Sequence, residues 1–392
     1  MKRVLFVSYN KHQRMFFNEI VKGKNSDNSV YEHVFLGRSW YRFLKKIPVF
    51  SDVIMSREKL DRVCSYEKAM IFSKQKIYPD IRVTVCENIA KRLYGYFLKY
   101  LRRANFDMVI VWNGSRLISA AALEAAKELG IKVLFMENGY FPNTIVVDPK
   151  GVNAESSLFG KSAENYLQVE IDYKKYKDFL KNGINKRALK KTTDDYEEEK
   201  INKENEYVFL PFQVHDDTQI IVNSPYIKKM EKLLELVCEN VEKYNYEHNS
   251  NYWIAVKEHP SDYGRIDYSE LFESYRNKNV IFYKKANTDE LIKNSKLVVT
   301  VNSSVGLESL FRDKPVITLG NAFYNIDGIV RNVKSEQEFY EKLCESLEEE
   351  VDKELNEKLL YYLRFHYLVE AKKPAHNQED VVNVIKRIEA YI

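Results

Sequence analysis

Short runs of consecutive apolar residues alternate along the chain with segments of helical periodicity. Runs such as Val4–Val7, Asp107–Trp112 and Tyr207–Pro211 are rich in β-branched and aromatic residues, which is typical of buried strands in a parallel sheet. Segments such as Ile227–Tyr244 carry apolar residues at three- and four-residue spacing, as amphipathic helices do. Strands that alternate with helices in this way predict an α/β fold with doubly wound sheets.

A strongly charged stretch at residues 173–205 separates two such α/β regions. Few of its residues could enter a core, so we expect a helical connector there. The sequence therefore predicts a Rossmann-like domain over residues 1–172 and a second one over residues 206–392, which ends in helices. The cleft between two facing domains of this kind is the expected binding site.

One strand–turn–helix–strand unit, Lys296–Gly328, contains the most informative turn. The apolar run Leu297–Val301 predicts a strand, and Asn302, Ser303 and Ser304 follow it directly, before a helix that begins near Gly306. The N-terminus of such a helix offers backbone N–H groups and a positive dipole end, which suit a phosphate. Serine and asparagine are also the ordinary capping residues of helices, so both interpretations stay open at this point.

Composition excludes several classes of protein. The 392 residues are 45% hydrophobic and 30% charged, as in folded globular domains, and the formal net charge of +4 is too small for a dedicated nucleic-acid binder. Four scattered cysteines suit reduced thiols better than a disulfide framework or a zinc site. The sequence shows neither a membrane-spanning run nor a signal peptide, so we expect a cytoplasmic protein.

Polar residues follow several of the predicted strands, where ligands of α/β sheets bind. Glu137 follows the strand at Val133–Met136, His259 follows the strand at Tyr252–Val256, and the Ser303–Ser304 turn belongs to the same predicted domain as His259. A histidine, two hydroxyl groups and a helix N-terminus would form a phosphate site without a metal.

Five blocks of the sequence resemble the bacterial capsule-synthesis β-Kdo glycosyltransferases, which are also described as capsule polysaccharide synthesis or export proteins. The blocks, in the family's order, are WNGSR from Trp112, ENGYFPNTIVVDPKGVNAESSL from Glu137, FQVHDDTQI from Phe212, KEHPSDYG from Lys257, and TVNSSVGLESLFRDKPVITLGNAFYNIDG from Thr300. Order and length fit the short, single-transferase members that act at the lipid end. The resemblance implies a GT-B fold, CMP-Kdo as the donor, and no metal or other cofactor.

The resemblance also implies roles for individual residues. Asp217 matches the aspartate of a Gln–x–x–x–Asp block and is the candidate nucleophile of a retaining reaction, while Glu137 matches the catalytic acid/base. Asp216 lies beside Asp217 and leaves the choice of nucleophile open. The donor-binding candidates are His259, Pro260, Asn302, Ser303, Ser304, Gly306, Gln213 and Lys257, and further candidates are Asp216, Gln219, Asn138, Gly139, Asn153 and Asn321. The family often has an acidic residue where this chain has Asn138.

Two stretches combine basic and aromatic residues, Ser39–Pro48 and Lys91–Arg103. Such helices can lie on anionic membranes, or they can pack an aromatic face on the core. A lipid or glycolipid acceptor would favour the first interpretation. We therefore expect a peripheral protein on the inner face of the inner membrane, with other capsule-assembly proteins as further candidate partners and no nucleic acid.

The sequence favours a β-Kdo transferase that acts in capsule linker synthesis, with a lysophospholipid as the expected acceptor. Two alternatives stay open: another GT-B surface-polymer enzyme, such as a sialyltransferase or a polyol-phosphate transferase, and a non-catalytic capsule-export protein. The sequence alone leaves the acceptor, the number of Kdo residues added and the oligomeric state undetermined.

Overall fold

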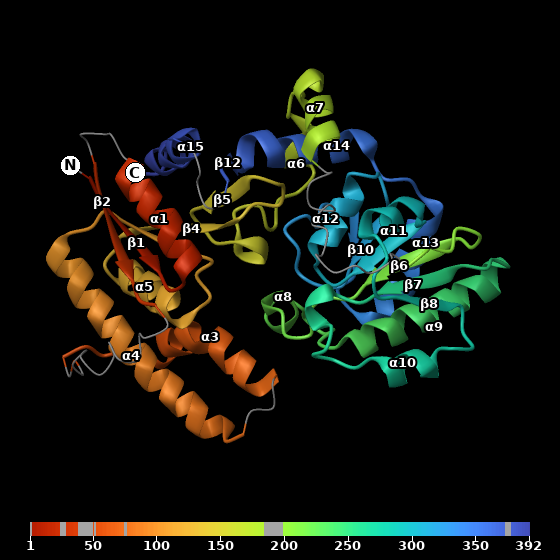
Figure 1. Cartoon of the computed structure of the whole chain (residues 1–392), viewed down its shortest axis with the longest axis horizontal. Helices are drawn as coiled ribbons and strands as arrows, with labels where there is room; N and C mark the ends of the chain where they lie inside the picture. The colour runs from red at the N-terminus through yellow and green to blue at the C-terminus, as the bar shows by residue number, and fades with distance from the viewer. Residues whose placement is uncertain are drawn as a thin grey trace. The chain divides into compact units, whose positions relative to one another are not determined.

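The computed structural model describes residues 2–23, 29–37, 50, 52–73, 77–183, 199–372 and 378–392 (Figure 1). The chain forms two compact units, which we call unit 1 (Met1–Ser157 with Arg364–Ile392) and unit 2 (Leu158–Leu363). Each unit contains its own sheet and its own hydrophobic core, so the predicted α/β class with two Rossmann-like sheets is confirmed.

Unit 1 has a mixed sheet of strand order β12-β5-β4-β3-β1-β2. The strands β1, β2, β3 and β4 pair in parallel, and β5 runs antiparallel to both β4 and β12. Its strands are β1 (Lys2–Ser8), β2 (Ser29–Phe35), β3 (Met108–Trp112), β4 (Lys132–Asn138), β5 (Thr144–Asp148) and β12 (Val369–Glu370). Its helices are α1 (Lys11–Gly23), α3 (Arg57–Ser73), α4 (Pro79–Ala104), α5 (Leu117–Glu128), α15 (Gln378–Glu389) and the short η1 (Asn153–Glu155), with the π-helical turn η4 (Leu363–Tyr367) at the boundary.

Unit 2 has a parallel sheet of strand order β11-β10-β9-β6-β7-β8. Its strands are β6 (Tyr207–Pro211), β7 (Trp253–Lys257), β8 (Val280–Tyr283), β9 (Leu297–Thr300), β10 (Val316–Thr318) and β11 (Val330–Asn332). Its helices are α6 (Glu164–Leu167), α7 (Tyr173–Gly183), α8 (Thr218–Ile221), α9 (Met230–His248), η2 (Pro260–Asp262), α10 (Ser269–Ser274), α11 (Thr288–Asn294), α12 (Ser304–Leu310), η3 (Glu336–Glu338), α13 (Phe339–Glu348) and α14 (Lys353–Tyr362). Apolar runs in β6, β7 and β9 are buried on both faces, as their sequence predicts.

The division into units differs from the predicted boundaries at two places. The C-terminal helix α15 belongs to unit 1, where Val384 and Ile388 enter the core beside α1, so the predicted C-terminal domain of residues 206–392 is too long. Residues 158–172 belong to unit 2, and so does α7 at the start of the predicted connector. Tyr176 and Phe179 of α7 are buried against aromatic rings of unit 2, because their three-residue spacing puts both on one face of a charged helix.

Candidate functional site

The sheet of unit 2 has a switch point between β6 and β9. From β6 the chain continues to β7 and β8 on one side of the sheet and then returns to β9 on the other side. Loops that leave a sheet in opposite directions open a crevice at the carboxyl ends of its strands, where ligands bind. The predicted residues Gln213, His259 and Asn302 follow the neighbouring strands β6, β7 and β9 at this edge.

Gln213 and Asn302 join the two sides of this switch point through buried hydrogen bonds. Gln213 Oε1 accepts from the backbone N–H of Asn302 at 3.0 Å and from Thr300 Oγ1 at 3.2 Å, and Gln213 Nε2 donates to Asn302 Oδ1 at 3.1 Å. Asn302 Nδ2 also donates to the carbonyl oxygen of Gln219 at 3.0 Å. The sequence predicted that both amides bind the CMP-sugar donor. In the structure their hydrogen-bonding groups contact other residues of the protein, and these contacts fix the loops after β6 and β9.

The turn into α12 has two serines in different situations. Ser303 Oγ accepts from the backbone N–H of Val305 at 3.2 Å and so caps the helix, whereas Ser304 is exposed and donates to Glu308 Oε1 at 3.3 Å. Gly306 lies against Tyr324, whose hydroxyl donates to the carbonyl of Ser303; a Cβ atom at Gly306 would lie 2.4 Å from that hydroxyl oxygen. The helix therefore starts with an ordinary cap, and Ser304 is the serine that faces solvent.

His259 follows β7 and caps the short helix η2. Its Nδ1 accepts from the backbone N–H of Ser261 at 3.1 Å, so the neutral ring carries its hydrogen on Nε2 and can donate it to a ligand. Burial lowers the pKa of His259, although Asp262 and Asp217 oppose that effect. Pro260 beside it is exposed, and Lys257 is buried with its pKa lowered by that burial.

The adjacent carboxylates Asp216 and Asp217 lie in different environments. Asp216 Oδ2 accepts from Arg265 Nη2 at 2.7 Å. Asp217 Oδ1 accepts from the backbone N–H of Gln219 at 3.0 Å, which caps α8. Burial raises the pKa of Asp217, and the nearby His259 acts in the opposite direction. Asp216 is thus held in an ion pair, while Asp217 is a half-buried carboxylate whose charge interacts with the candidate phosphate-binding histidine.

A buried aspartate that the sequence analysis did not single out organises this loop. Asp262 is 1% exposed and accepts from His215 twice, from the backbone N–H at 2.9 Å and from ring Nδ1 at 2.8 Å. Arg265 Nη1 lies 3.7 Å from Asp262 Oδ1. Asp262 therefore fixes the position of the His215-Asp216-Asp217 segment. His215 lies in the block FQVHDDTQI and Asp262 in the block KEHPSDYG. Their hydrogen bonds form only in the folded protein, so the spacing of residues in the sequence could not predict them.

The remaining candidates of unit 2 have supporting contacts. Gln219 Oε1 accepts from Asn223 Nδ2 at 3.1 Å, and the carbonyl of Asn223 accepts from the backbone N–H of Asn321 at 2.9 Å. The side chain of Asn321 is exposed at the carboxyl end of β10. These contacts connect the loop after β10 to α8.

Glu137 lies within the end of β4 in unit 1, not beyond the strand as its sequence position suggested, because β4 continues to Asn138 in its pairing with β5. Its carboxylate accepts three hydrogen bonds: from Trp112 Nε1 at 3.0 Å, from Asn113 Nδ2 at 2.8 Å and from the backbone N–H of Asn138 at 2.7 Å. Trp112 ends β3 and Asn113 follows it, and both belong to the block WNGSR. Three donors orient the Glu137 carboxylate at the carboxyl edge of this sheet.

The other predicted residues of unit 1 shape its loops. Gly139 donates from its backbone N–H to the carbonyl of Thr144 at 2.8 Å, and a Cβ atom there would lie 2.6 Å from the backbone of Thr144. The side chain of Asn138 is exposed. Asn153 has φ 54°, and its carbonyl accepts from Ser156 Oγ at 2.7 Å. We therefore assign structural contacts to Gly139 and Asn153, while Asn138 faces solvent beside Glu137.

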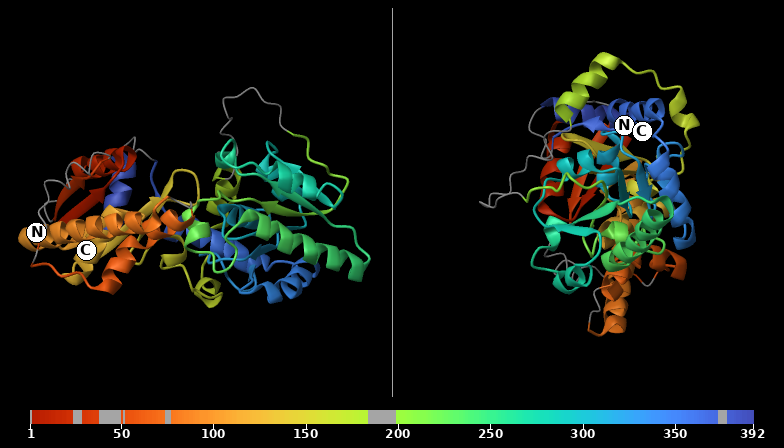
Figure 2. Two further views of the ribbon diagram at one scale, coloured as in Figure 1. Left: turned by 90° about the horizontal axis from the view of Figure 1, so that it is seen from below. Right: turned by 90° about the vertical axis from the view of Figure 1, so that its right-hand side faces the viewer.

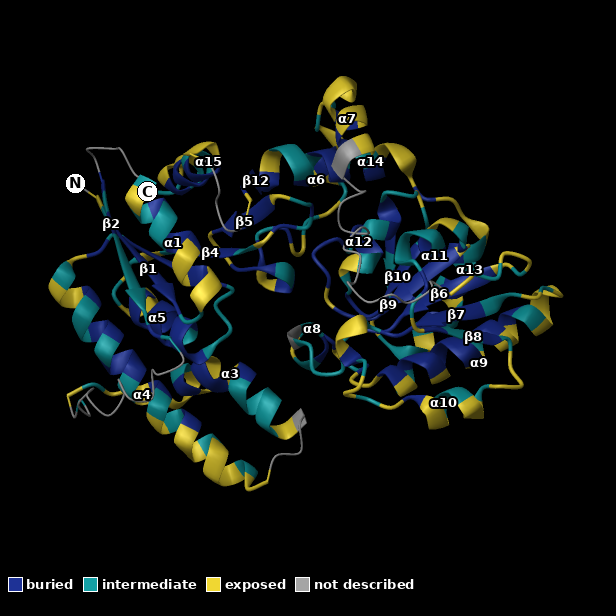
Figure 3. Cartoon of the chain, viewed as in Figure 1, coloured by how far each residue is buried: buried dark blue, intermediate teal, exposed yellow. Residues whose placement is uncertain are grey.

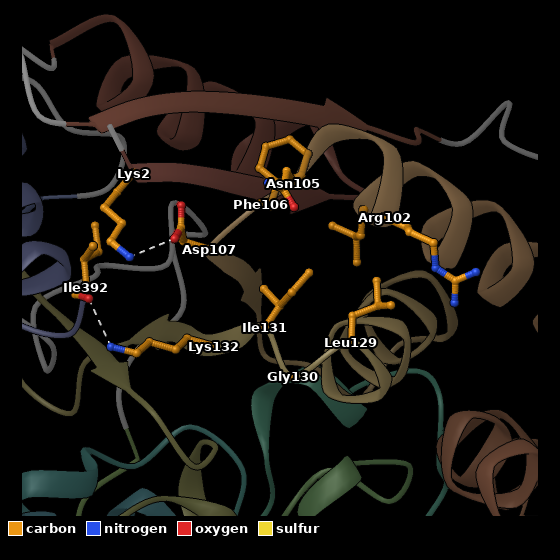
Figure 4. Close-up of a pocket in the computed structure, with 11 residues that line it drawn as sticks. Lys2, Arg102, Asn105, Phe106, Asp107, Leu129, Gly130, Ile131, Lys132 and Ile392 are labelled. Atoms are coloured by element: carbon orange, nitrogen blue, oxygen red, sulfur yellow. Dashed lines mark hydrogen bonds and ion pairs between the residues drawn. The ribbon is translucent and has the colours of Figure 1, made fainter.

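A cavity of about 400 Å³ in unit 1 lies away from these residues (Figure 4). Lys2 and Lys132 line it and begin β1 and β4, so it is at the strand edge opposite to Glu137. Lys2 pairs with Asp107 at 2.8 Å, and Lys132 donates to the carbonyl of Ile392 at 3.0 Å. Lys2 and Lys132 thus already have partners, and none of the predicted site residues lines the cavity.

Two negative observations concern the described residues only. In those parts of the chain, no three His, Cys, Asp or Glu side chains come together as metal ligands do. None of the helices described combines the length and the hydrophobicity that crossing a bilayer requires.

The stretch Ser39–Pro48, predicted to bind membranes, lies outside the described residues. In Lys91–Arg103, Tyr94 and Phe97 are buried in unit 1, so these aromatic rings pack on the core as the alternative interpretation held.

Known proteins resemble this chain over different shares of their length. It is 34% identical over 248 residues to Protein FixF of Sinorhizobium fredii. The aligned region covers 62% of this chain and 56% of FixF, so the chain spans little more than half of that relative. It is 24% identical to the capsule polysaccharide export protein KpsS of Escherichia coli, over 61% of this chain and 73% of KpsS. A solved structure titled "Thermosulfurimonas dismutans KpsC, beta Kdo 2,7 transferase" is similar with 15% identity and a TM-score of 0.47, over 97% of this chain and 99% of the other.

The family described as "Capsule polysaccharide biosynthesis protein" matches residues 171–369. That range contains β6 to β11 of unit 2, with Gln213, Asp217, His259 and the turn into α12. It is half of the chain and agrees with the predicted family. This chain belongs to the capsule polysaccharide biosynthesis protein family.

Proposed function

We propose that this protein is a GT-B glycosyltransferase that uses CMP-Kdo, without a metal, to add β-Kdo to a lysophospholipid in capsule linker synthesis. The observation that carries the proposal is the group of residues at the switch point of unit 2. There the half-buried carboxylate of Asp217 follows β6 and His259 follows the neighbouring strand β7, within the part of the chain that matches the capsule family. The relative KpsS is a capsule polysaccharide export protein, which suggests the pathway for this chain, and the resemblance of its sequence blocks to the β-Kdo transferases suggests the donor.

The phosphate of CMP would bind to His259 and the start of α12. His259 would donate from Nε2, and Ser304 would donate from its exposed hydroxyl. Negative charge grows on this phosphate as the bond to the sugar breaks. Donors already in place at that position stabilise the transition state more than the bound substrate, which is what accelerates the reaction.

Asp217 would attack the anomeric carbon of the sugar from the face opposite to the departing phosphate. The bond from that carbon to CMP breaks, CMP leaves as the anion, and a glycosyl ester to Asp217 forms. Asp216 is a weaker candidate for this step, because its ion pair with Arg265 at 2.7 Å stabilises the carboxylate and reduces its nucleophilicity. Asn302 and Gln213 would act indirectly, by holding the loops that carry the reacting groups.

Glu137 would take the proton from the acceptor hydroxyl, whose oxygen then attacks the anomeric carbon and releases Asp217. Two displacements at one carbon keep its configuration, so the reaction would be retaining. The donors from Trp112, Asn113 and Asn138 would keep the carboxylate oriented for that proton transfer. In the competing inverting route, Glu137 would activate the acceptor in a single displacement without a covalent intermediate.

The test of the function is donor turnover. The purified chain is incubated with CMP-Kdo and a synthetic lysophospholipid, and CMP release and glycolipid are both measured, with CMP-sialic acid as the competing donor. We expect turnover with CMP-Kdo alone. Release from CMP-sialic acid instead would indicate a sialyltransferase, and no release from either donor, with intact CMP binding, would indicate a non-catalytic capsule protein.

Two variants test the roles within the site. His259→Ala should lower turnover by about 100-fold and weaken CMP binding, because a donor to the leaving phosphate is lost. Asp217→Asn should abolish transfer but keep CMP binding, since asparagine preserves the size and the cap of α8. Unchanged CMP affinity, by calorimetry, in both His259→Ala and a Ser303→Ala/Ser304→Ala protein would refute the phosphate site.

We further propose that the protein works in the cytoplasm as a peripheral protein on the inner membrane, where a lipid acceptor would be reached. The exposed cations Lys91, Arg102 and Arg103 on α4 could contribute about 1 kcal/mol each near an anionic surface. Replacing Arg102 and Arg103 with glutamine should then weaken sedimentation with anionic liposomes, and equal sedimentation would assign these cations to an ordinary solvated face.

A further inference from the structure

The end of the α3–α4 helical hairpin in unit 1 exposes five large apolar side chains within fourteen residues of sequence. Phe72 is 58% exposed, Ile77 and Tyr78 are 71% exposed, Ile81 is 62% exposed and Val85 is 51% exposed. We call these five residues the hairpin tip. Other exposed apolar side chains of the described residues, such as Met15, Val222 and Tyr246, are scattered over different elements. Scattered apolar residues are normal on a surface, but a concentration at one place indicates a contact with something else.

Ion pairs behind the hairpin tip hold the two helices together. Lys68 of α3 lies 2.7 Å both from Asp61 of its own helix and from Glu87 of α4, and Arg57 lies 3.1 Å from Glu87. Both side chains of the Lys68–Glu87 pair are mostly buried, which makes it stronger than a pair in open solvent. These ion pairs therefore fix the two helices that carry the hairpin tip to each other.

The hairpin reaches away from the sheet of unit 1. Figure 1 and the two views of Figure 2 show α3 and α4 running together past the strands of that unit, and Figure 3 shows the exposed end of α4. Within unit 1, the apolar side chains thus sit on a projection and do not line a groove. A projection of this kind is suited to entering a soft apolar medium, whereas a peptide or a small ligand requires a concave site.

The charges around the hairpin tip fit the interface of a phospholipid membrane. The sequence from residue 69 to 86 carries one acidic residue, Asp80, and three cations, Lys74, Lys76 and Arg82, and this excess of positive charge suits an anionic membrane surface. Tyr78 precedes α4 with φ 55°, and no side chain caps this N-terminus. The first-turn N–H groups and the positive end of a 26-residue helix therefore lie beside apolar side chains. Phospholipids present the matching pair, an anionic phosphate beside acyl chains.

We propose that the hairpin tip inserts into the headgroup and upper acyl region of a phospholipid membrane. This contact differs from the cationic one proposed for the other end of α4, and it does not depend on the donor chemistry. Ile77, Ile81 and Val85 would enter the acyl region, and Tyr78 would lie at the headgroup level, where tyrosine is enriched. The hairpin would hold unit 1, with Glu137, at the surface from which a lipid acceptor comes.

The test is flotation of the full chain with vesicles of phosphatidylglycerol and phosphatidylethanolamine that contain neither donor nor acceptor. Ile77→Ser/Ile81→Ser should partition at least about tenfold more weakly than the parent, because two large apolar side chains leave the contact. Ile54→Ser is the matched control, since Ile54 is 88% exposed and lies outside the hairpin tip. Binding through the hairpin tip should also survive high salt, whereas binding through Arg102 and Arg103 should not.

A second measurement locates the residue in the bilayer. Tyr78→Trp should show fluorescence quenched by lipids brominated near the top of their acyl chains, beyond the quenching of the parent's own tryptophans. Equal flotation of Ile77→Ser/Ile81→Ser and the parent, with no quenching in Tyr78→Trp, would overturn the proposal. It would also be overturned if the double variant turned a dimer into a monomer while vesicle binding stayed the same, because a second copy would then cover the hairpin tip. Loss of CMP-Kdo turnover alone would count against the proposed function and not against this contact.

Discussion

Replacing Gln213 with alanine tests whether the buried amide network holds the candidate site together. Gln213→Ala removes three hydrogen bonds and leaves Thr300 Oγ1, the backbone N–H of Asn302 and Asn302 Oδ1 without these partners. These groups belong to buried residues, so water replaces the lost bonds poorly. At about 1 kcal/mol for each bond, unit 2 should lose about 3 kcal/mol of unfolding free energy.

For a unit of this size, that loss should lower the melting temperature by about 6–12 °C. The assay is thermal unfolding of the full chain followed by circular dichroism, together with calorimetric titration of CMP at a temperature where the variant is folded. CMP affinity should also fall, because Asn302 and Ser303 would no longer be fixed between β6 and β9. Gln337→Ala is the matched control, since Gln337 is exposed on the short helix η3. A melting temperature of Gln213→Ala within about 1 °C of the parent would refute this reasoning.

Three further predictions concern the reaction itself. Burial raises the pKa of Asp217 above its ordinary value of 3.8, and the carboxylate must be ionised to act as a nucleophile. The initial rate should therefore begin to fall, as the pH is lowered, before the pH reaches 3.8. A rate that stays constant down to pH 3.8 would contradict this role. Trp112→Phe removes one donor to Glu137 and should lower kcat about tenfold without changing CMP affinity, whereas an unchanged kcat would show that this hydrogen bond is dispensable. Turnover should persist in excess EDTA, and loss of activity that Mg²⁺ restores would require a metal-assisted mechanism.

The parallel strands β1, β3 and β4 of unit 1 and β6 to β10 of unit 2 could be predicted from the sequence because parallel strands buried on both faces need continuous apolar runs. The positions of His259 and Asn302 followed from the same pattern, since residues that end neighbouring strands meet at one edge of the sheet. In contrast, β2, β5 and β12 of unit 1 and β11 of unit 2 were missed. The strands β2, β11 and β12 lie at an edge of their sheet, β5 and β12 pair antiparallel, and β12 has only two residues, which is too few for a periodic pattern.

Contacts between residues far apart in sequence account for the other differences. The return of α15 to unit 1 depends on packing against α1, and an amphipathic C-terminal helix does not indicate which core it joins. The pairing of His215 with Asp262 spans 47 residues, so neither residue stood out by itself. Gln213 was recognised as a site residue, but only the structure shows that its amide is used within the protein.

The covalent intermediate is the most direct test of the proposed reaction. Glu137→Gln should still bind CMP-Kdo and form the ester with Asp217, but it cannot accept the proton of the acceptor hydroxyl, so the glycosyl enzyme should accumulate. Intact-mass spectrometry after incubation with CMP-Kdo should then show an increase of one Kdo residue, and peptide mapping should place it on Asp217. An adduct on Asp216 would keep the mechanism and change the nucleophile. No adduct, together with an inverted linkage in the product of the parent enzyme, would contradict the retaining mechanism.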